Sequence, residues 1–309
     1  MGVNDLSKKL RDSSVTPDEI ASDVRLSGKR LGVDFMVVAH KAIGSYDGAA
    51  EMAMEPEIAS STMKESARQK RQEARQKYLD IVTEFEGRTI PPSQLKEAKA
   101  FVKNMAYVSD KIVAVGVEVF RDHGHEVYGT CFESDFQLVY WEKKGFTAGT
   151  LTIDSDIYAM GSKLTIDLVN YNSAKGKCKI LVRSEVQKKI MVGSENWSQY
   201  DTLIYCALCG CDFIPRLFKV PAKNITQFMI QWKDPANTQS LNDMLDSFSQ
   251  GWHWPGGNGK PGALAVDYRK RVLACVGLMM HGPVISKDYE IVPLNELPAG
   301  KSWVETIGR

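Results

Sequence analysis

The stretch that decides the fold runs from Cys131 to Ser162 and reads CFESDFQLVYWEKKGFTAGTLTIDSDIYAMGS. It contains two pairs of acidic residues, Glu133 with Asp135 and Asp154 with Asp156, and one residue separates the members of each pair. Like charges held this close in a partly dry site repel each other strongly unless a cation lies between them. Hard carboxylate oxygens favour Mg²⁺ or Mn²⁺. The alternative is that the second pair consists of solvated loop acids.

The residues between and after the two pairs predict how the acids are positioned. The apolar residues of Phe136–Trp141 predict a buried helix, and Gly149–Ile153 predicts a short buried strand. Residues i and i+2 of a strand point to the same face, so Asp154 and Asp156 are expected to project together at the strand's carboxyl end. In an open α/β sheet, sites form at that end.

Composition limits the classes of protein that the chain can belong to. Its 309 residues allow one large domain or two small ones, and 43% hydrophobic with 25% charged residues is ordinary for a globular protein. The net charge of +1 means that any nucleic-acid surface must be local. No apolar run is long enough to span a membrane, and no apolar signal segment opens the chain. The six cysteines show no secreted framework, which predicts a reducing compartment, nucleus or cytosol.

A metal site is one interpretation of three closely spaced cysteines, Cys206, Cys209 and Cys211. However, the first two belong to the apolar run Leu203–Cys209, and no second CxxC or paired histidine completes a zinc set. We therefore predict that these are buried helix cysteines.

Hydrophobic patterning predicts further elements on either side of the acidic stretch. Gly28–Asp34 is a basic turn leading into a short strand that ends on an acid, and Leu164–Asn170 with Cys178–Val182 predicts a hairpin. The remaining expectations are helices in Pro91–Val119, Asp201–Gly210, Asn224–Trp232 and Leu241–Phe248, a brief strand at Tyr128–Thr130 and a loop at Gly251–Gly262.

Met63–Tyr78, MKESARQKRQEARQKY, predicts a helix of a different character. Lys64, Arg68, Arg71 and Arg75 share one face, and a basic stripe of this kind suits phosphates. The alternative is a solvated charged helix.

Acids therefore stand at the ends of several apolar elements in a βα alternation. This arrangement suggests a carboxylate cluster for two divalent ions. The candidate members are Asp34, Glu133, Asp135, Asp154, Asp156 and Asp212.

With these motifs in place, the sequence resembles the XPG-type structure-specific 5′ nucleases, which include flap endonuclease and exonuclease 1. The matching pieces cover most of residues 1–215 in the family's order, and AHKA with AAEMAMEPE is most similar to exonuclease 1. The pieces are MGVNDL, GKRLGVDFMVVAHKA, the basic helix, CFESDFQLVYWEKKG, TIDSDIYAMGS and GCDF, and EIVPLNELP resembles the segment that closes the family's nuclease core.

The resemblance implies an α/β fold with a PIN-like, mostly parallel central sheet flanked by helices, a helical arch and a C-terminal helix–turn–helix region. It implies one nuclease core over residues 1–309. Within it, residues 1–100 carry the basic arch helix, 110–235 the internal nuclease region with the helix–turn–helix, and 236–309 an extension that wraps the core.

The resemblance also implies a role for each matching residue. Asp34, Glu133 and Asp135 match the acids of the first metal, and Asp154, Asp156 and Asp212 match those of the second. Lys64 and Arg71 match the arch residues that steady the scissile phosphate, with Arg68 as a substitute if the register slips. Gly2 matches the family's amino-terminal glycine near the DNA, and Lys223 could meet a duplex phosphate. His40 matches a ring that stacks on the base next to the cut; the alternative is a core histidine.

The function implied by the resemblance is hydrolysis of DNA phosphodiesters at 5′ ends, flaps or gaps by two Mg²⁺ ions, or Mn²⁺ in their place, about 4 Å apart. Such an enzyme would act as a monomer in nuclear DNA repair or replication. The sequence shows no clamp-binding motif of the Gln-x-x-aliphatic-x-x-aromatic-aromatic form. The alternative is a nuclease-fold protein that has lost catalysis and serves as a nucleic-acid-binding or scaffold module.

Two departures from the family pattern matter. The family has a strand ending in Phe-Asp-Gly before the arch helix, and this sequence lacks that triplet; Asp47 and Glu86 resemble it only locally. The family also has a Gly-x-Gly hairpin that binds duplex phosphates and K⁺, where this chain has Lys219-Val220-Pro221. Bulky residues do not allow the same close backbone approach, and proline removes an N–H donor.

Overall fold

The computed structural model describes residues 29–39, 65–105, 108, 110–152, 154–172, 177–190, 193–256 and 259–307. The chain divides into two compact units. The sheet unit comprises Met1–Asp34 and Thr130–Arg309, and the helical unit comprises Phe35–Gly129. The single nuclease core expected over residues 1–309 stays a prediction.

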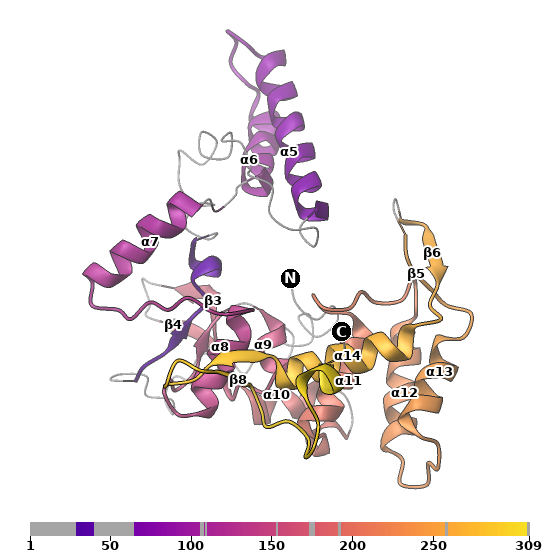
Figure 1. Ribbon diagram of the computed structural model, residues 1–309. Coiled ribbons are helices and arrows are strands. Elements are labelled where there is room, and N and C mark those ends of the chain that lie inside the picture. Colours follow the sequence, from indigo (N-terminus) through magenta and orange to yellow (C-terminus); the bar gives the residue numbers. More distant parts are fainter. Residues whose placement is uncertain are drawn as a thin grey trace. The chain divides into compact units, whose positions relative to one another are not determined.

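A four-stranded sheet organises the sheet unit (Figure 1). Its strands, in spatial order, are β1 (Gly32–Val33), β2 (Thr150–Leu151), β3 (Leu164–Asn172) and β4 (Lys177–Val182). The first three are parallel neighbours, and β4 is antiparallel to β3. The sheet is thus mostly parallel and has helices beside it, which confirms the predicted α/β class. The predicted hairpin is confirmed as β3 and β4.

The hydrophobic core of this unit is formed mainly by helices. Phe136–Tyr140 are all buried in α8 (Ser134–Lys143), as predicted. Residues 201–209 are all buried in α11 (Gln199–Cys209), including Cys206 and Cys209, and the helix ends at Gly210 as expected. The other helical elements of this unit are α9 (Ser155–Ala159), α10 (Arg183–Ile190), η2 (Ser194–Asn196), α12 (Ala222–Lys233), α13 (Leu241–Ser249), α14 (Tyr268–His281) and α15 (Trp303–Ile307).

Buried Glu142 attaches α8 to the start of β3. Its carboxylate accepts hydrogen bonds from the hydroxyl of Ser162 (2.6 Å) and from the N–H groups of Lys163 (2.8 Å) and Leu164 (2.9 Å). Charge-assisted bonds of this kind are among the stronger ones in proteins. They fix the helix that begins next to Glu133 relative to the sheet.

The helical unit contains α5 (Glu65–Glu84), α6 (Pro92–Met105) and α7 (Asp110–Asp122). The predicted basic helix is confirmed as α5 and extends six residues beyond Tyr78. Ala74 and Tyr78 of α5 pack against Phe101 and Val102 of α6. The single helical pattern expected over Pro91–Val119 is in fact divided between α6 and α7.

Two expectations about local structure are wrong. Tyr128–Thr130 is irregular, not a strand. Gly251–Gly262 is not all loop, because it contains β5 (His253–Pro255) and the start of β6 (Pro261–Leu264), which pair antiparallel. A hydrogen bond to backbone far away in the sequence supports β5: the His253 carbonyl accepts a hydrogen bond from the N–H of Phe218 at 2.8 Å. A further antiparallel pair, β7 (Pro283–Ile285) with β8 (Ile291–Pro293), follows α14.

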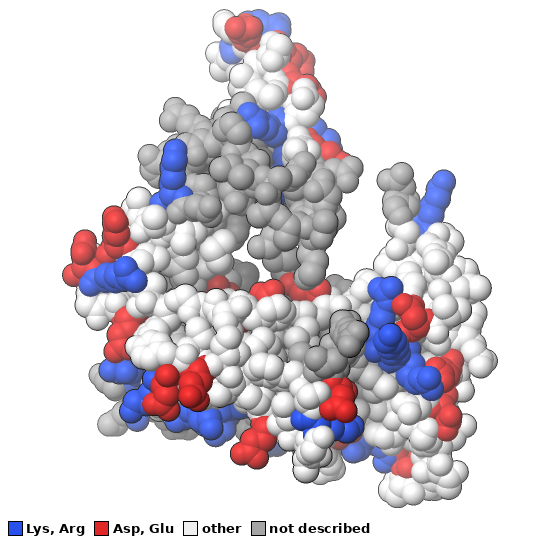
Figure 2. All heavy atoms as spheres, in the orientation of Figure 1, with Lys and Arg blue, Asp and Glu red and all other residues white. Residues whose placement is uncertain are grey.

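Acidic and basic side chains are interspersed over the face shown in Figure 2, with acidic ones gathered near the centre of the view. Among the described helices, none combines the length and the apolar character needed to cross a membrane.

Candidate active site

Asp34 lies directly after β1, at the edge where the parallel strands β1 and β2 both end. Its N–H continues the strand ladder by donating to the carbonyl of Leu151 at 3.0 Å. Its carboxylate accepts a hydrogen bond from the Thr152 hydroxyl at 3.2 Å. Because parallel strands present their carboxyl ends at one edge, the residues after β1 and after β2 meet there.

Asp154 and Asp156 do not lie on a strand, so the prediction that they share one face of a strand is wrong. Asp154 is the N-cap of α9, and its carboxylate accepts the N–H of Asp156 at 3.0 Å. The Asp154 N–H in turn donates to the Thr152 hydroxyl at 3.1 Å. A short acidic side chain satisfies an otherwise unpaired N–H at a helix start, so the helix begins where the strand was expected to continue. The two aspartates still lie next to each other.

Asp156 is the most deeply buried acid of the group, with 2% of its surface exposed. Its Oδ1 atom has no hydrogen-bond partner within the described part of the chain. Burial, followed by the charge of Asp154, raises its pKa to about 9. A buried oxygen in this position is stable only if the carboxyl group is protonated or if a cation meets it.

Glu133 and Asp135 belong to the start of α8. Glu133 is exposed at the N-cap position, and Asp135 lies in the first turn. Burial raises the pKa of Asp135 well above its ordinary value, and the charges of Asp154, Asp34, Glu133 and Asp212 add to this. Asp135 is therefore close enough to acids from three other segments for their charges to act on it.

Asp212 is exposed just beyond the end of α11. The neighbouring Cys211 holds this segment in place, because its N–H donates to the Ile214 carbonyl at 2.9 Å and its sulfur lies 3.6 Å from that of Cys275. Burial raises the pKa of Asp154, although the hydrogen bond from the N–H of Asp156 lowers it. The charges of Asp212 and Asp34 add to the rise.

The structure thus brings the six predicted acids into one electrostatically coupled group. They come from four segments of the chain: the residue after β1, the start of α8, the start of α9 and the loop after α11. In the described ranges, no three His, Cys, Asp or Glu side chains are arranged so that they could hold a metal ion. The assignment of individual acids to two metals stays a prediction.

Thr152 is a residue that sequence reasoning missed. Its hydroxyl links Asp34 to the backbone of Asp154, so it sets the positions of two acids at once. The available signal was a threonine two residues before the acid at a predicted strand end, since such hydroxyls often bond to backbone two residues further on.

The predicted phosphate-binding residues are placed only in part. Arg71 shares one face of α5 with Ala74, Arg75 and Tyr78, and this face packs on α6; both arginines are therefore half-buried rather than fully solvated. Lys223 is exposed in the first turn of α12. Gly2, His40, Lys64 and the side chain of Arg68 lie outside the described residues. All of these roles stay predictions.

Lys219-Val220-Pro221 makes a tight turn without glycine. Lys219 has φ 54°, which is in the left-handed region, and Pro221 is the N-cap of α12. The turn is held by Arg216, whose guanidinium donates to the Val220 carbonyl at 2.5 Å.

No protein-family model matches the chain, and no curated protein sequence matches it. Among solved structures, the catalytic core of Rad2 in complex with DNA substrate is similar with a TM-score of 0.50, at 12% identity over 91% of this chain and 87% of that chain. This chain shares the fold of the Rad2 catalytic core.

Two further structures resemble the chain. Flap endonuclease-1 from Methanococcus jannaschii has a TM-score of 0.44 at 15% identity, over 86% of this chain and 95% of that chain. Human GEN1 in complex with Holliday junction DNA has a TM-score of 0.43 at 18% identity, over 80% of this chain and 58% of that chain.

Proposed function

We propose that this chain is a divalent-metal-dependent, structure-specific 5′ nuclease of the XPG type that hydrolyses DNA phosphodiesters. The observation that carries the proposal is the coupled group of six carboxyl groups that four segments of the sheet unit bring together. The shared fold supports it, since the Rad2 catalytic core was solved with a DNA substrate. Acids from four segments have no structural reason to gather unless a cation offsets their repulsion.

The donor set fits Mg²⁺ or Mn²⁺ by its chemistry. All its members supply hard carboxylate oxygens, and the Oδ1 atom of Asp156 is a buried oxygen without a described partner. We assign Asp34, Glu133 and Asp135 to one ion and Asp154, Asp156 and Asp212 to the second. Bound divalent ions would supply Lewis-acid polarisation of the phosphate and a lowered pKa of attacking water.

The chain's own residues would orient these donors and the DNA. Thr152 restricts the carboxylate of Asp34, and the N–H of Asp156 restricts that of Asp154, so these side chains are fixed before substrate binds. Lys64 and Arg71, with Arg68 as a substitute, would offset charge on the scissile phosphate. His40 would stack on a terminal base and Gly2 would lie near the DNA, while Lys223 would contact a duplex phosphate.

The wider role follows from the same proposal. DNA with 5′ ends, flaps or gaps would be the substrate, the enzyme would belong with exonuclease 1 within the family, and it would act as a monomer in nuclear DNA repair or replication. Sliding-clamp or repair proteins are candidate partners, although the sequence shows no clamp-binding motif.

A second candidate is a nuclease-fold scaffold that binds nucleic acid without cutting it. The absence of a Phe-Asp-Gly triplet from the sequence favours it. The scaffold is also favoured because, in the described segments, no three His, Cys, Asp or Glu side chains are arranged to coordinate a metal ion.

A cleavage assay separates the two candidates. A 5′-labelled flap and a recessed duplex are incubated with the protein in Mg²⁺ and in EDTA, and cleavage is expected only in Mg²⁺. Asp154→Ala should lose cleavage and keep DNA affinity, because it removes a metal ligand, while Asp288→Ala, an exposed acid in the β7–β8 turn, should cut normally. Cleavage by the Asp154→Ala variant at the wild-type rate would exclude the metal assignment. DNA binding without cleavage by the wild type would support the scaffold.

A further inference from the structure

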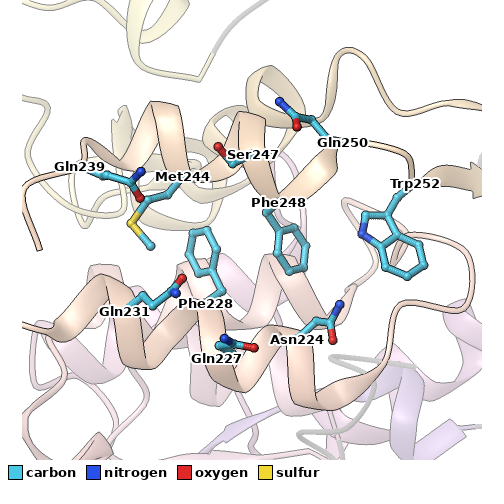
Figure 3. Close-up of a pocket in the computed structure, with 10 residues that line it drawn as sticks. All are labelled: Asn224, Gln227, Phe228, Gln231, Gln239, Met244, Ser247, Phe248, Gln250 and Trp252. Carbon is cyan, nitrogen blue, oxygen red and sulfur yellow. The ribbon is translucent and has the colours of Figure 1, made fainter.

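A pocket of about 310 Å³ lies between α12 and α13, in a region to which the proposed function gives no task beyond Lys223. Its volume is at the lower end of the range for ligand sites. Figure 3 shows side chains of both helices converging on it, with Trp252 at one end. The lining residues are Asn224, Gln227, Phe228, Gln231, Gln239, Met244, Ser247, Phe248, Gln250 and Trp252.

The side chains that line the pocket indicate which kind of ligand it binds. None of the ten lining residues is charged, five carry carboxamides and three are aromatic. A carboxamide both donates and accepts hydrogen bonds, so the matching ligand is neutral and carries donors and acceptors on one edge. Aromatic side chains favour a flat, conjugated partner. A nucleobase has all of these properties, and Asn and Gln are the side chains that pair with adenine edges.

The aromatic wall is held in place by neighbouring rings. Phe248 meets Phe228 edge-on, with ring centroids 5.4 Å apart, and stacks on Tyr268 at 6.0 Å. Trp252 is half-buried, and its backbone bonds to Ser249 and Ala265 at 3.1 Å each. A base entering the pocket would therefore meet rings that are already ordered, which lowers the entropic cost of stacking.

The rim of the pocket supplies positive charge for a strand. Lys223 is exposed one turn before Gln227 on the same face of α12, and the first turn of that helix contains no acid. Uncharged walls with Lys223 one turn beyond them suit a base inside and a phosphate outside, and this favours a nucleic-acid strand over a peptide.

We propose that the α12–α13 pocket binds one unpaired base of a DNA strand, with Gln227 and Gln231 bonding to the base edge and Trp252 stacking on its face. This inference rests on the proposed function. It adds a base-binding site on the sheet unit to the contacts made by phosphate-binding residues.

The test compares a short single-stranded oligonucleotide with an abasic strand of the same length and charge, by fluorescence anisotropy in EDTA. The wild type should bind the base-bearing strand more tightly. Gln227→Ala combined with Gln231→Ala should reduce this preference about fivefold or more, since two hydrogen bonds are lost, and should leave affinity for the abasic strand unchanged. Both glutamines are exposed, so the fold is retained. Asn242→Ala, an exposed carboxamide of α13 outside the lining, is the matched control.

The possible failures are distinguishable. If the wild type binds both strands equally while cleaving flaps, the pocket proposal falls and the proposed function stands. If it binds neither strand and cuts no DNA, both fall. If the double variant keeps the full preference, bases bind elsewhere and the pocket proposal is overturned; this is also the result expected if the pocket takes a peptide.

Discussion

Asp156 is an acid whose surroundings in the folded protein disfavour its charged form. It is nearly fully buried, its pKa is raised to about 9 by burial and by Asp154, and one of its oxygens has no described partner. In the unfolded chain, by contrast, an aspartate titrates near its reference value of about 3.9. Between these two values the folded protein holds a proton that the unfolded chain has released.

This difference predicts a pH dependence of stability. Because the folded state binds more protons between about pH 4 and pH 9, the free energy of unfolding falls as pH rises through this range. Asp156→Asn carries an uncharged amide at every pH and should remove this loss. We expect its stability relative to the wild type to improve by at least about 1.4 kcal/mol between pH 5 and pH 8, measured by urea unfolding without divalent ions. Asp288→Asn is the exposed control, and parallel profiles for Asp156→Asn and the wild type would contradict the prediction.

Lys219 gives a second prediction at the residue scale. Its φ of 54° lies in a region where an L-residue pays about 1 kcal/mol or more. Lys219→Gly should therefore raise the free energy of unfolding by about 0.5–1 kcal/mol, after the greater flexibility of glycine in the unfolded chain is deducted. Lys219→Ala keeps the Cβ atom and should give no such gain. Equal urea midpoints for the two variants would show that backbone strain is not the cause.

The identities of the acids could be predicted from the sequence, whereas their local geometry could not. An acid after a short apolar run is visible in the pattern, as with Asp34. The N-cap role of Asp154 was missed because a buried five-residue helix has no polar face, so its periodicity cannot be told from that of a strand.

Among the elements, α11 depends on one buried carboxylate for its attachment to α12. Asp201 accepts hydrogen bonds from Ser198 in a capping box, from the indole of Trp232 at 3.0 Å and from the ammonium of Lys233 at 2.8 Å. Burial alone would raise its pKa, but the bonds from Lys233, Ser198 and Trp232 outweigh burial and lower it. The stability that this carboxylate provides is present near neutral pH and is lost in acid.

Asp201→Ala should therefore destabilise the protein by about 2–4 kcal/mol, because it removes a helix cap and takes the acceptor from the half-buried indole of Trp232. The matched change is Asp246→Ala. This residue pairs with Arg269 at 2.7 Å, but both side chains are about half exposed, so the expected loss is within about 0.5 kcal/mol. Thermal and urea unfolding of the two variants measures the difference, and similar losses would refute the special role of Asp201.

The elements that were predicted correctly are those whose pattern is local. The β3–β4 hairpin and the helices α8 and α11 follow from runs of apolar residues between turn signals. The β5–β6 hairpin was missed because Gly, Pro and Asn between residues 251 and 262 are typical of loops. Its strands depend instead on distant partners, since the His253 carbonyl bonds to Phe218 and the Trp252 carbonyl to Ala265.

For the whole molecule, the α/β class was within reach of sequence reasoning because strands, helices and acids alternate along the chain. The convergence of the acids is not a local property, because it brings together residues from Asp34 to Asp212. No local pattern encodes such distances; the expectation came from acids at the ends of several apolar elements and was strengthened by the family resemblance, and the charge coupling among the acids agrees with it.

Convergence on this scale predicts that a divalent ion stabilises the entire chain. A ligand that binds only the folded state adds about 2.7 kcal/mol at a hundred times its dissociation constant. Mg²⁺ should therefore raise the melting temperature by a few degrees or more relative to EDTA. The gain should be larger at pH 8 than at pH 5.5, because the raised pKa values of Asp135 and Asp156 make protons compete with the ion at lower pH. Asp34→Asn combined with Asp154→Asn should lose the gain, while Asp288→Asn should keep it. A melting temperature that does not respond to Mg²⁺ at pH 8 would mean that the acids are held together by protons alone.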